Sequence, residues 1–322
     1  MKRMIVLLIA AAMCMSGCTQ AAAPALEEPK TINMGGLFFI DQASGKLMMY
    51  DGNAEKHETN VEGPVSSFAK TDEGVYYVND NSLNVYWFSE EESEKLAEGR
   101  FSSLVAGDEY IFFFEDDEYG DHIGLCAMSI RDFAIKRMEL SGVSSLSAHS
   151  NTAYFAMLSD DYTELSLYKW SPNDDEIKLL YPNCRYDSLN MSNGSLIFDC
   201  NEGRMVYDCE TKDFAAFIYS LEYTDSIVYY DENFLIASGG LDNDMQSINS
   251  ISRGAVVKNI PLHDQTNVSV IDENNDMLLL QMKTAVPHIE GAPVSSEGSY
   301  EKTYALFDKN SLSITYPADM QQ

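Results

Sequence analysis

Short apolar stretches recur along the chain, and each ends in a large apolar residue followed by Ser or Asp. Successive copies lie 37 to 56 residues apart. Ser and Asp favour a turn at this position because their side chains hydrogen-bond to the backbone that follows. We interpret each copy as the end of a strand, at Tyr50-Asp51, Phe88-Ser89, Met128-Ser129, Trp170-Ser171, Tyr207-Asp208, Ile251-Ser252 and Phe307-Asp308.

Two further elements share this period. Ahead of each copy lies a run rich in β-branched and aromatic residues, which is too short for a buried helix and typical of a strand covered on both faces. These runs are 36–40, 74–78, 110–114, 153–156, 196–198, 234–236 and 277–280. A serine followed by an apolar residue marks another strand, at Ser67, Ser103, Ser145, Ser188, Ser226 and Ser269. The segment after each Ser/Asp turn supplies a fourth strand.

Four strands in a repeating unit of about 40 residues indicate a β-propeller blade. The sequence therefore predicts an all-β chain in which residues 31–322 form a β-propeller of seven four-stranded blades. Either residues 31–34 or the C-terminus would supply the inner strand of the first blade. A pair of β-sandwiches is the competing fold.

The N-terminus has the pattern of an export signal. Two basic residues, an apolar run from Met4 to Met15 and small residues before Cys18 are the parts of a secretory signal, and the run is too short to span a bilayer. Residues 15–18 (MSGC) resemble the lipobox of bacterial lipoproteins, in which the cysteine carries the lipid. We expect a signal peptide at 1–17, a lipid-anchored flexible tether at 18–30 and an extracytoplasmic location at the cell membrane. Secretion without a lipid is the alternative.

The chain is strongly acidic, with 51 Asp and Glu against 21 Lys and Arg and a formal net charge of −30. Such a charge repels phosphate backbones and anionic lipid heads, so we expect neither nucleic-acid binding nor membrane contact beyond the lipid on Cys18. It favours cationic partners, or serves simply as a solvated surface.

One repeat unit resembles a known family. Residues 74–80 (GVYYVND), 84–88 (NVYWF) and 94–96 (EKL) follow the order seen in bacterial propellers with low-density-lipoprotein-receptor-like (YWTD-type) repeats. The resemblance is clearest at 64–100 and weaker at 33–63 and 143–184. It implies a propeller in a lipoprotein of a Gram-positive bacterium, and it brings no catalytic residues to this chain.

Motifs for catalysis are largely absent. The sequence has no Gly-x-Ser-x-Gly elbow, no phosphate-binding glycine loop and no His-Glu-x-x-His, and its five histidines are scattered singly. We therefore expect a protein that is not an enzyme and has no cofactor. Calcium is the alternative, bound by Asp116, Asp117 and Asp121 in an acidic loop, although the loop lacks the Asp-x-Asp-x-Asp-Gly order.

An insertion at 284–300, rich in Pro, Gly and Ser, is the best candidate for contact with a partner, because loops longer than about 12 residues are often functional. We expect Pro287, His288 and Tyr300 of this insertion to contact the partner. Trp87, outside the insertion, is a further candidate because it lies one residue out of the repeat phase. Four cysteines follow Cys18, and we expect free thiols. Cys200 and Cys209 lie on adjacent strands without facing each other.

The expected function is a surface-anchored module that binds a protein, peptide or glycan outside the cytoplasm. The alternatives are a glycan hydrolase or lyase that uses carboxylates and tyrosines, and a structural scaffold of an envelope assembly. Propellers serve all three roles, so the fold does not choose among them.

Overall fold

The computed structural model describes residues 36–159, 164–184, 189–217, 226–230, 234–238, 246–252, 255–262, 267–285 and 300–317. Chain contacts divide the protein into residues 1–32 and residues 33–322, and every described residue lies in the second unit. The expected signal peptide, the tether with Cys18 and residues 31–34 lie outside the described residues. Within the described part, no helix has the length and apolarity that a membrane span requires.

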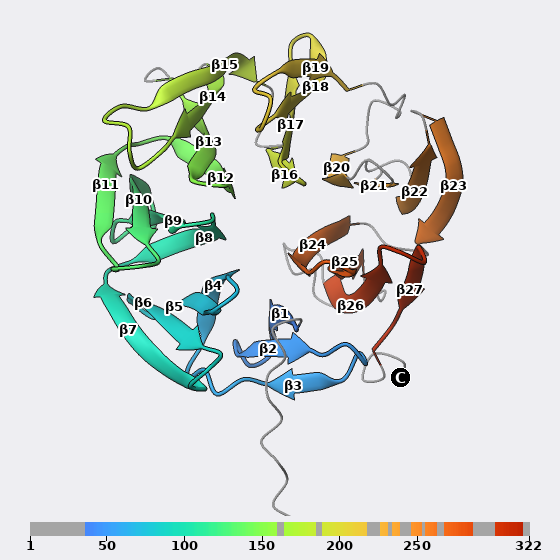
Figure 1. Ribbon diagram of the computed structural model, residues 1–322, viewed down its shortest axis with the longest axis horizontal. Coiled ribbons are helices and arrows are strands. Elements are labelled where there is room, and N and C mark those ends of the chain that lie inside the picture. The colour runs from blue at the N-terminus through green and yellow to red at the C-terminus, as the bar shows by residue number, and fades with distance from the viewer. Residues whose placement is uncertain are drawn as a thin grey trace, which may run out of the picture. The chain divides into compact units, whose positions relative to one another are not determined.

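Consecutive strands pair antiparallel into up-and-down sheets (Figure 1). Four sheets have four strands each. They are β4–β7 (Val65–Lys70, Gly74–Asn79, Ser82–Trp87, Glu92–Glu98), β8–β11 (Phe101–Ala106, Tyr110–Asp116, His122–Ser129, Ile135–Glu139), β20–β23 (Ser226–Tyr230, Phe234–Ser238, Gln246–Ser252, Ala255–Leu262) and β24–β27 (Asn267–Glu273, Met277–Ala285, Tyr300–Asp308, Ser313–Thr315).

The remaining strands form two sheets of other sizes. β1–β3 (Leu37–Ile40, Leu47–Tyr50, Lys56–Glu58) make a three-stranded sheet. An eight-stranded sheet contains β12–β15 (Val143–His149, Thr152–Leu158, Leu165–Trp170, Lys178–Cys184) and β16–β19 (Asn190–Ser192, Ser195–Cys200, Gly203–Asp208, Phe214–Ala216).

The sheets stand radially around a common axis, with β1, β4, β8, β12, β16, β20 and β24 nearest to it (Figure 1). Each of these inner strands contacts the inner strand of the next sheet, and β24 contacts β1. Buried apolar clusters fill the spaces between neighbouring sheets. One cluster, for example, joins Tyr76 and Val85 to Ile111, Phe113 and Met128. The core is therefore a series of layers between sheets, as the doubly buried strands of a propeller require.

The β-propeller prediction is confirmed, and the runs expected to be strands are strands. The predicted number of seven four-stranded blades is not met, since four separate sheets have that form. Cys184 pairs with Cys200 and so joins β15 to β17 in one sheet of eight strands. Of the two segments expected to supply a further inner strand to the first sheet, residues 31–34 lie outside the described residues. The C-terminal strand β27 pairs with β26 and does not supply it.

Candidate functional site

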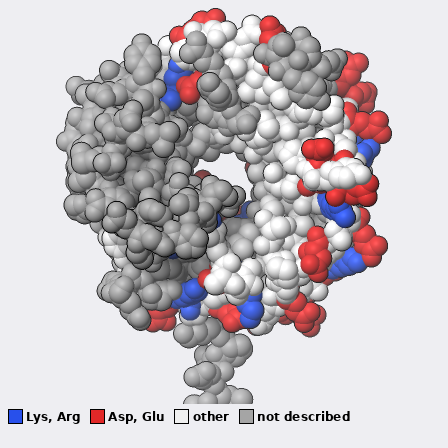
Figure 2. Space-filling model, turned by 180° about the vertical axis from the view of Figure 1, so that it is seen from behind, with Lys and Arg blue, Asp and Glu red and all other residues white. Residues whose placement is uncertain are grey.

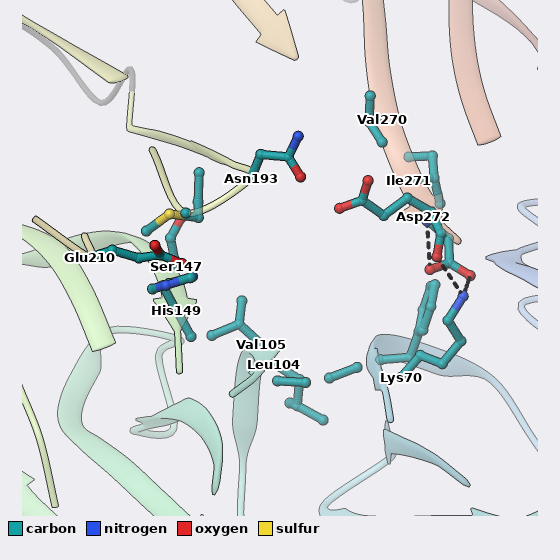
Figure 3. A pocket seen from close by; sticks show the side chains of 17 residues that line it. Lys70, Leu104, Val105, Ser147, His149, Asn193, Glu210, Val270, Ile271 and Asp272 are labelled. Atoms are coloured by element: carbon teal, nitrogen blue, oxygen red, sulfur yellow. Dashed lines mark hydrogen bonds and ion pairs between the residues drawn. The ribbon is translucent and has the colours of Figure 1, made fainter. Parts of the chain in front are cut away.

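A pocket of about 780 Å³ lies on the axis of the propeller, at the ends of five inner strands (Figure 3). β4, β8, β12 and β24 supply the residues at or near their C-terminal ends, and the turn after β16 adds Asn193 and Gly194. Inner strands that converge on an axis bring side chains from distant repeats to one place. The pocket has polar groups at two sides and an apolar region between them.

One polar side is a buried ion pair. The Lys70 ammonium lies 2.6 Å from Asp272 Oδ2, and it also donates to the carbonyl oxygens of Glu273 (2.9 Å) and Gly36 (3.3 Å). Asp272 accepts further hydrogen bonds from the backbone amides of Phe38 and Glu273, each at 2.8 Å. Burial raises the pKa of Asp272, and the Lys70 charge opposes that rise. Both side chains therefore have their polar partners within the protein, and the pair joins β4 to β24 in the wall of the pocket.

The other polar side carries Ser147, His149 and Glu210, which lie near one another in Figure 3. Ser147 and His149 are two residues apart on β12 and point to the same face because side chains alternate along a strand. Gly194 has φ +69, and a Cβ on it would lie 2.9 Å from the His149 ring. A glycine at this position therefore lets the β16–β17 turn pack against the imidazole.

Leu104 and Val105 lie between these polar sides, while Val270 and Ile271 lie beside Asp272 (Figure 3). Seen from behind, the Asp and Glu side chains of the described residues gather along the outer edge, whereas the described residues that border the central opening on the right of this view are largely uncharged (Figure 2). A cavity of 300–1,000 Å³ on which a few polar groups converge has the usual size of a ligand site. The arrangement suits a ligand with an apolar body and hydrogen-bonding ends.

Of the residues predicted to contact a partner, Trp87 lies away from the axis. It ends β6, is half-buried, and packs against Phe133 with ring centroids 6.1 Å apart. It lines a second pocket, between the sheets β4–β7 and β8–β11. Pro287 and His288 lie outside the described residues. Tyr300 begins β26 opposite Ala285, and residues 286–299 between them lie outside the described residues. The structure does not bring Trp87 into the central pocket.

Of the three predicted calcium ligands, Asp116 ends β9 and Asp117 and Asp121 lie in the β9–β10 turn. Asp117 Oδ1 accepts the backbone amides of Tyr119 (2.8 Å) and Asp121 (3.0 Å), and Asp116 Oδ1 lies 2.5 Å from His122 Nδ1. These contacts account for the acidic turn without an ion. Calcium binding here stays a prediction.

Sequence reasoning missed two groups. Asp51, Glu55 and His57 have ligand atoms within 4.8 Å of one another and could hold a metal ion, but Asp51 Oδ1 already accepts the amides of Asn53 and Glu55 in the β2–β3 turn. The residues that line the central pocket were also not predicted. The repeated serine followed by an apolar residue marks the inner strands, and the ends of these strands form the pocket, so this repeat was the signal that could have located it.

No protein-family model matches this sequence, and no curated protein is significantly similar to it. Solved structures do match. A chain from a study of two prolyl endopeptidases is 10% identical, over 88% of this chain and 48% of that chain, with a TM-score of 0.60. The WD40 repeats of RRP9 are 9% identical over 76% and 83%, with a TM-score of 0.50. A chain of the nidogen/laminin complex is 11% identical over 73% and 96%, with a TM-score of 0.44.

These matches show the propeller fold alone, because the identities are very low. They do not establish membership of the low-density-lipoprotein-receptor-like family. They do correct one expectation, which was that the chain is not an enzyme. The prolyl endopeptidase structure has the same fold over most of this chain, so the absence of common sequence motifs does not separate this chain from enzymes.

Proposed function

We propose that residues 33–322 form a binding module that holds a protein, peptide or glycan in the central pocket. One observation carries the proposal: five inner strands meet at a cavity of about 780 Å³ with polar groups on two sides and apolar residues between them. His149, Glu210 and Ser147 would contact the polar groups of the ligand, and Leu104 and Val270 its apolar body.

We also propose the location and the finer architecture predicted from the sequence. The chain is exported, carries a lipid on Cys18, faces outward from the cell membrane and does not bind nucleic acid. The MSGC sequence at 15–18 supports the anchor. Replacing Cys18 with Ala should release the protein from the membrane fraction, and a variant that stays there would contradict the anchor.

The eight-stranded sheet would count as two blades, giving seven with β1–β3. Its support in the structure is the contact of β12 with both β8 and β16, as between inner strands of separate sheets. An experimental structure in which β15 and β17 pair along their whole length would contradict it.

A thermal-shift screen of the full-length chain tests the function. The panel holds peptides, wall fragments and oligosaccharides, and a ligand at 100 times its dissociation constant should stabilise the fold by about 2.7 kcal/mol. Ser147→Phe, which fills the pocket, should abolish the shift, while Ser89→Phe on an exposed turn should preserve it. Analysis of the same mixtures for cleaved products tests the hydrolase or lyase alternative.

A flat panel together with no specific cross-link to a protein in intact cells would overturn the proposal. Stable co-purification with fixed neighbours that survives Ser147→Phe would instead favour the scaffold alternative.

A further inference from the structure

A second pocket, of about 580 Å³, lies between the sheets β4–β7 and β8–β11. Its walls come from the β4–β5 turn, the end of β6, the β8–β9 turn and the β10–β11 turn. No described residue lines both this pocket and the central pocket. The two linings come close along the chain near the β8–β9 turn, where Ala106 lines the central pocket and Asp108 lines the second one.

Three aromatic residues line this second pocket: Trp87, Tyr110 and Phe133. Trp87 is held in place on two sides. Its indole N–H donates to Glu94 Oε2 at 3.3 Å, and the buried ring of Tyr76 lies edge-on to it at 6.3 Å. The three aromatic rings therefore belong to fixed elements, and π-faces of this kind attract cations.

The charge of the lining is negative. Glu73, Asp108, Glu109 and Asp132 supply four carboxylates, and Arg131 is the single basic residue among the lining residues. The Glu109 carboxylate accepts a hydrogen bond from Asn151 at 3.0 Å, and that of Asp132 accepts the Ala134 amide at 3.3 Å. Within the part of the chain that the structure describes, the exposed carboxylates of Glu73 and Asp108 have no such structural hydrogen bond.

We propose that this pocket binds an organic cation, with an alkylammonium group facing Glu73 and Asp108 and its apolar stem on the rings of Trp87 and Phe133. Aromatic faces and carboxylates together favour such groups. The apolar stem is buried against the rings, and the carboxylates attract the positive charge of the ammonium group. A lysine side chain of a peptide and a free choline-type amine share this chemistry.

Tryptophan fluorescence of the full-length chain provides the test, because Trp170 is fully buried and Trp87 is therefore the reporter. N-acetyl-lysine methylamide and choline are titrated against N-acetyl-norleucine methylamide, the neutral counterpart of the lysine probe. The cations should give a saturable change that weakens with added salt. Saturation by the lysine probe alone indicates a peptide source, and saturation by choline alone indicates a free amine. An equal response to norleucine, or no saturation by either cation, would overturn the proposal.

Charge-neutralising variants separate the pocket from the general acidity of the surface. Glu73→Gln and Asp108→Asn should each weaken binding about fivefold, the scale of a single cation–π or ion-pair contact. Glu118→Gln removes the same charge from the exposed β9–β10 turn, outside the lining of the pocket, and should leave binding unchanged. If all three variants weaken binding equally, the pocket is not the site.

A separate observation concerns two cysteines. Cys184 on β15 lies directly opposite Cys200 on β17, in the pair that joins the two parts of the eight-stranded sheet. Opposed residues of antiparallel strands have Cβ atoms about 4.5–5.5 Å apart, and small adjustments bring such a pair to disulfide geometry. Both thiols are free in this structure. Burial and the neighbouring Cys200 thiol raise the pKa of Cys184 to about 11.

We infer that Cys184 and Cys200 form a disulfide in an oxidising environment. The thiolate of one cysteine attacks a small disulfide such as oxidised glutathione and releases one thiol. The second thiolate then displaces the other, so one protein S–S bond forms and the oxidant leaves as two thiols. The raised pKa of Cys184 makes the first step slow at neutral pH.

Peptide mapping of the full-length chain after incubation with oxidised glutathione tests this inference. A Cys184–Cys200 cross-linked peptide is expected, and it should persist in a Cys126→Ser/Cys209→Ser variant and disappear in Cys184→Ser. A bond from Cys200 to Cys209, or quantitative alkylation of both thiols after long oxidation, would overturn it.

Discussion

At the scale of single residues, the repeated Asp and Ser have identifiable tasks. Asp208 and Asp308 each accept backbone amides two and three residues further on, at 2.8 and 2.9 Å, which forms the turn before the outer strand. The repeated serines lie at irregularities of the inner strands: Ser103 and Ser145 have φ of 55 and 53, where the register with the next strand shifts. Ser67 Oγ accepts the Leu104 amide of the neighbouring sheet at 3.0 Å.

Asp308 should stabilise the protein in a pH-dependent way. The amides of Ser311 and Asn310 hold the pKa of Asp308 below its ordinary value of 3.8. A carboxyl whose pKa is lowered on folding adds stability above that value and loses it as the pH falls through the folded pKa. Asp308→Ala should therefore lower the free energy of unfolding by about 1 kcal/mol at neutral pH. In urea unfolding, the difference in free energy between the wild type and Asp308→Ala should shrink when the pH is lowered below the ordinary pKa of 3.8. A difference that does not change with pH would contradict this account.

Ser67→Ala should also destabilise the fold, because the Leu104 amide loses its acceptor between two sheets. The expected loss is about 1 kcal/mol in urea unfolding. Ser66→Ala is the matched control, since Ser66 is exposed in the same strand. Equal effects from the two variants would show that the inter-sheet hydrogen bond is not the cause.

At the scale of elements, neighbouring sheets meet through their turns as well as their faces. The Asp108 amide donates to the Ser150 carbonyl at 2.9 Å, and the Glu109 amide donates to Asn151 Oδ1 at 2.9 Å. These contacts join the β8–β9 turn to the β12–β13 turn. Gly107 makes the approach feasible, because a Cβ there would lie 2.1 Å from the Ser150 carbonyl oxygen.

Gly107→Ala should therefore separate the two turns and cost about 2 kcal/mol, as overpacking against the backbone does. Gly52→Ala supplies the comparison, since a Cβ there has nothing within 4 Å. Both are measured by urea unfolding monitored through circular dichroism. If Gly107→Ala leaves the free energy of unfolding unchanged, the two turns can move apart without cost and this account is wrong.

At the scale of the whole propeller, closure depends on contacts of the last sheet with the first sheet and with β4 of the second. Lys70 of β4 meets Asp272 of β24 and the carbonyl oxygen of Gly36 ahead of β1, and Tyr304 of β26 donates to the Ile40 carbonyl at 3.3 Å. No strand of the described residues is shared between the first and last sheets, so side chains hold that junction.

Lys70→Met should leave the Asp272 carboxylate largely buried without its cation and cost about 3 kcal/mol, near the lower limit for a broken buried pair. The side chains of Lys70 and Asp272 are 15% and 10% exposed. Lys95→Met breaks the exposed pair with Glu98 and should cost much less, because solvent screens exposed ion pairs. Urea unfolding compares the free energies of unfolding of the two variants. Similar losses of stability in both would contradict a special role for the Lys70–Asp272 pair.

The sequence by itself determined the strands, their turns and the propeller, because alternation, β-branched runs and Ser/Asp turns act over a few neighbouring residues. Tyr76 and Phe113 lie in runs predicted to be covered on both faces, and both are buried. Tertiary structure alone decided the sites. Lys70 and Asp272 are 202 residues apart, and the pairing of Cys184 with Cys200 depends on how two repeats meet. Such pairs arise when the inner strands close around an axis, and no local pattern encodes that arrangement.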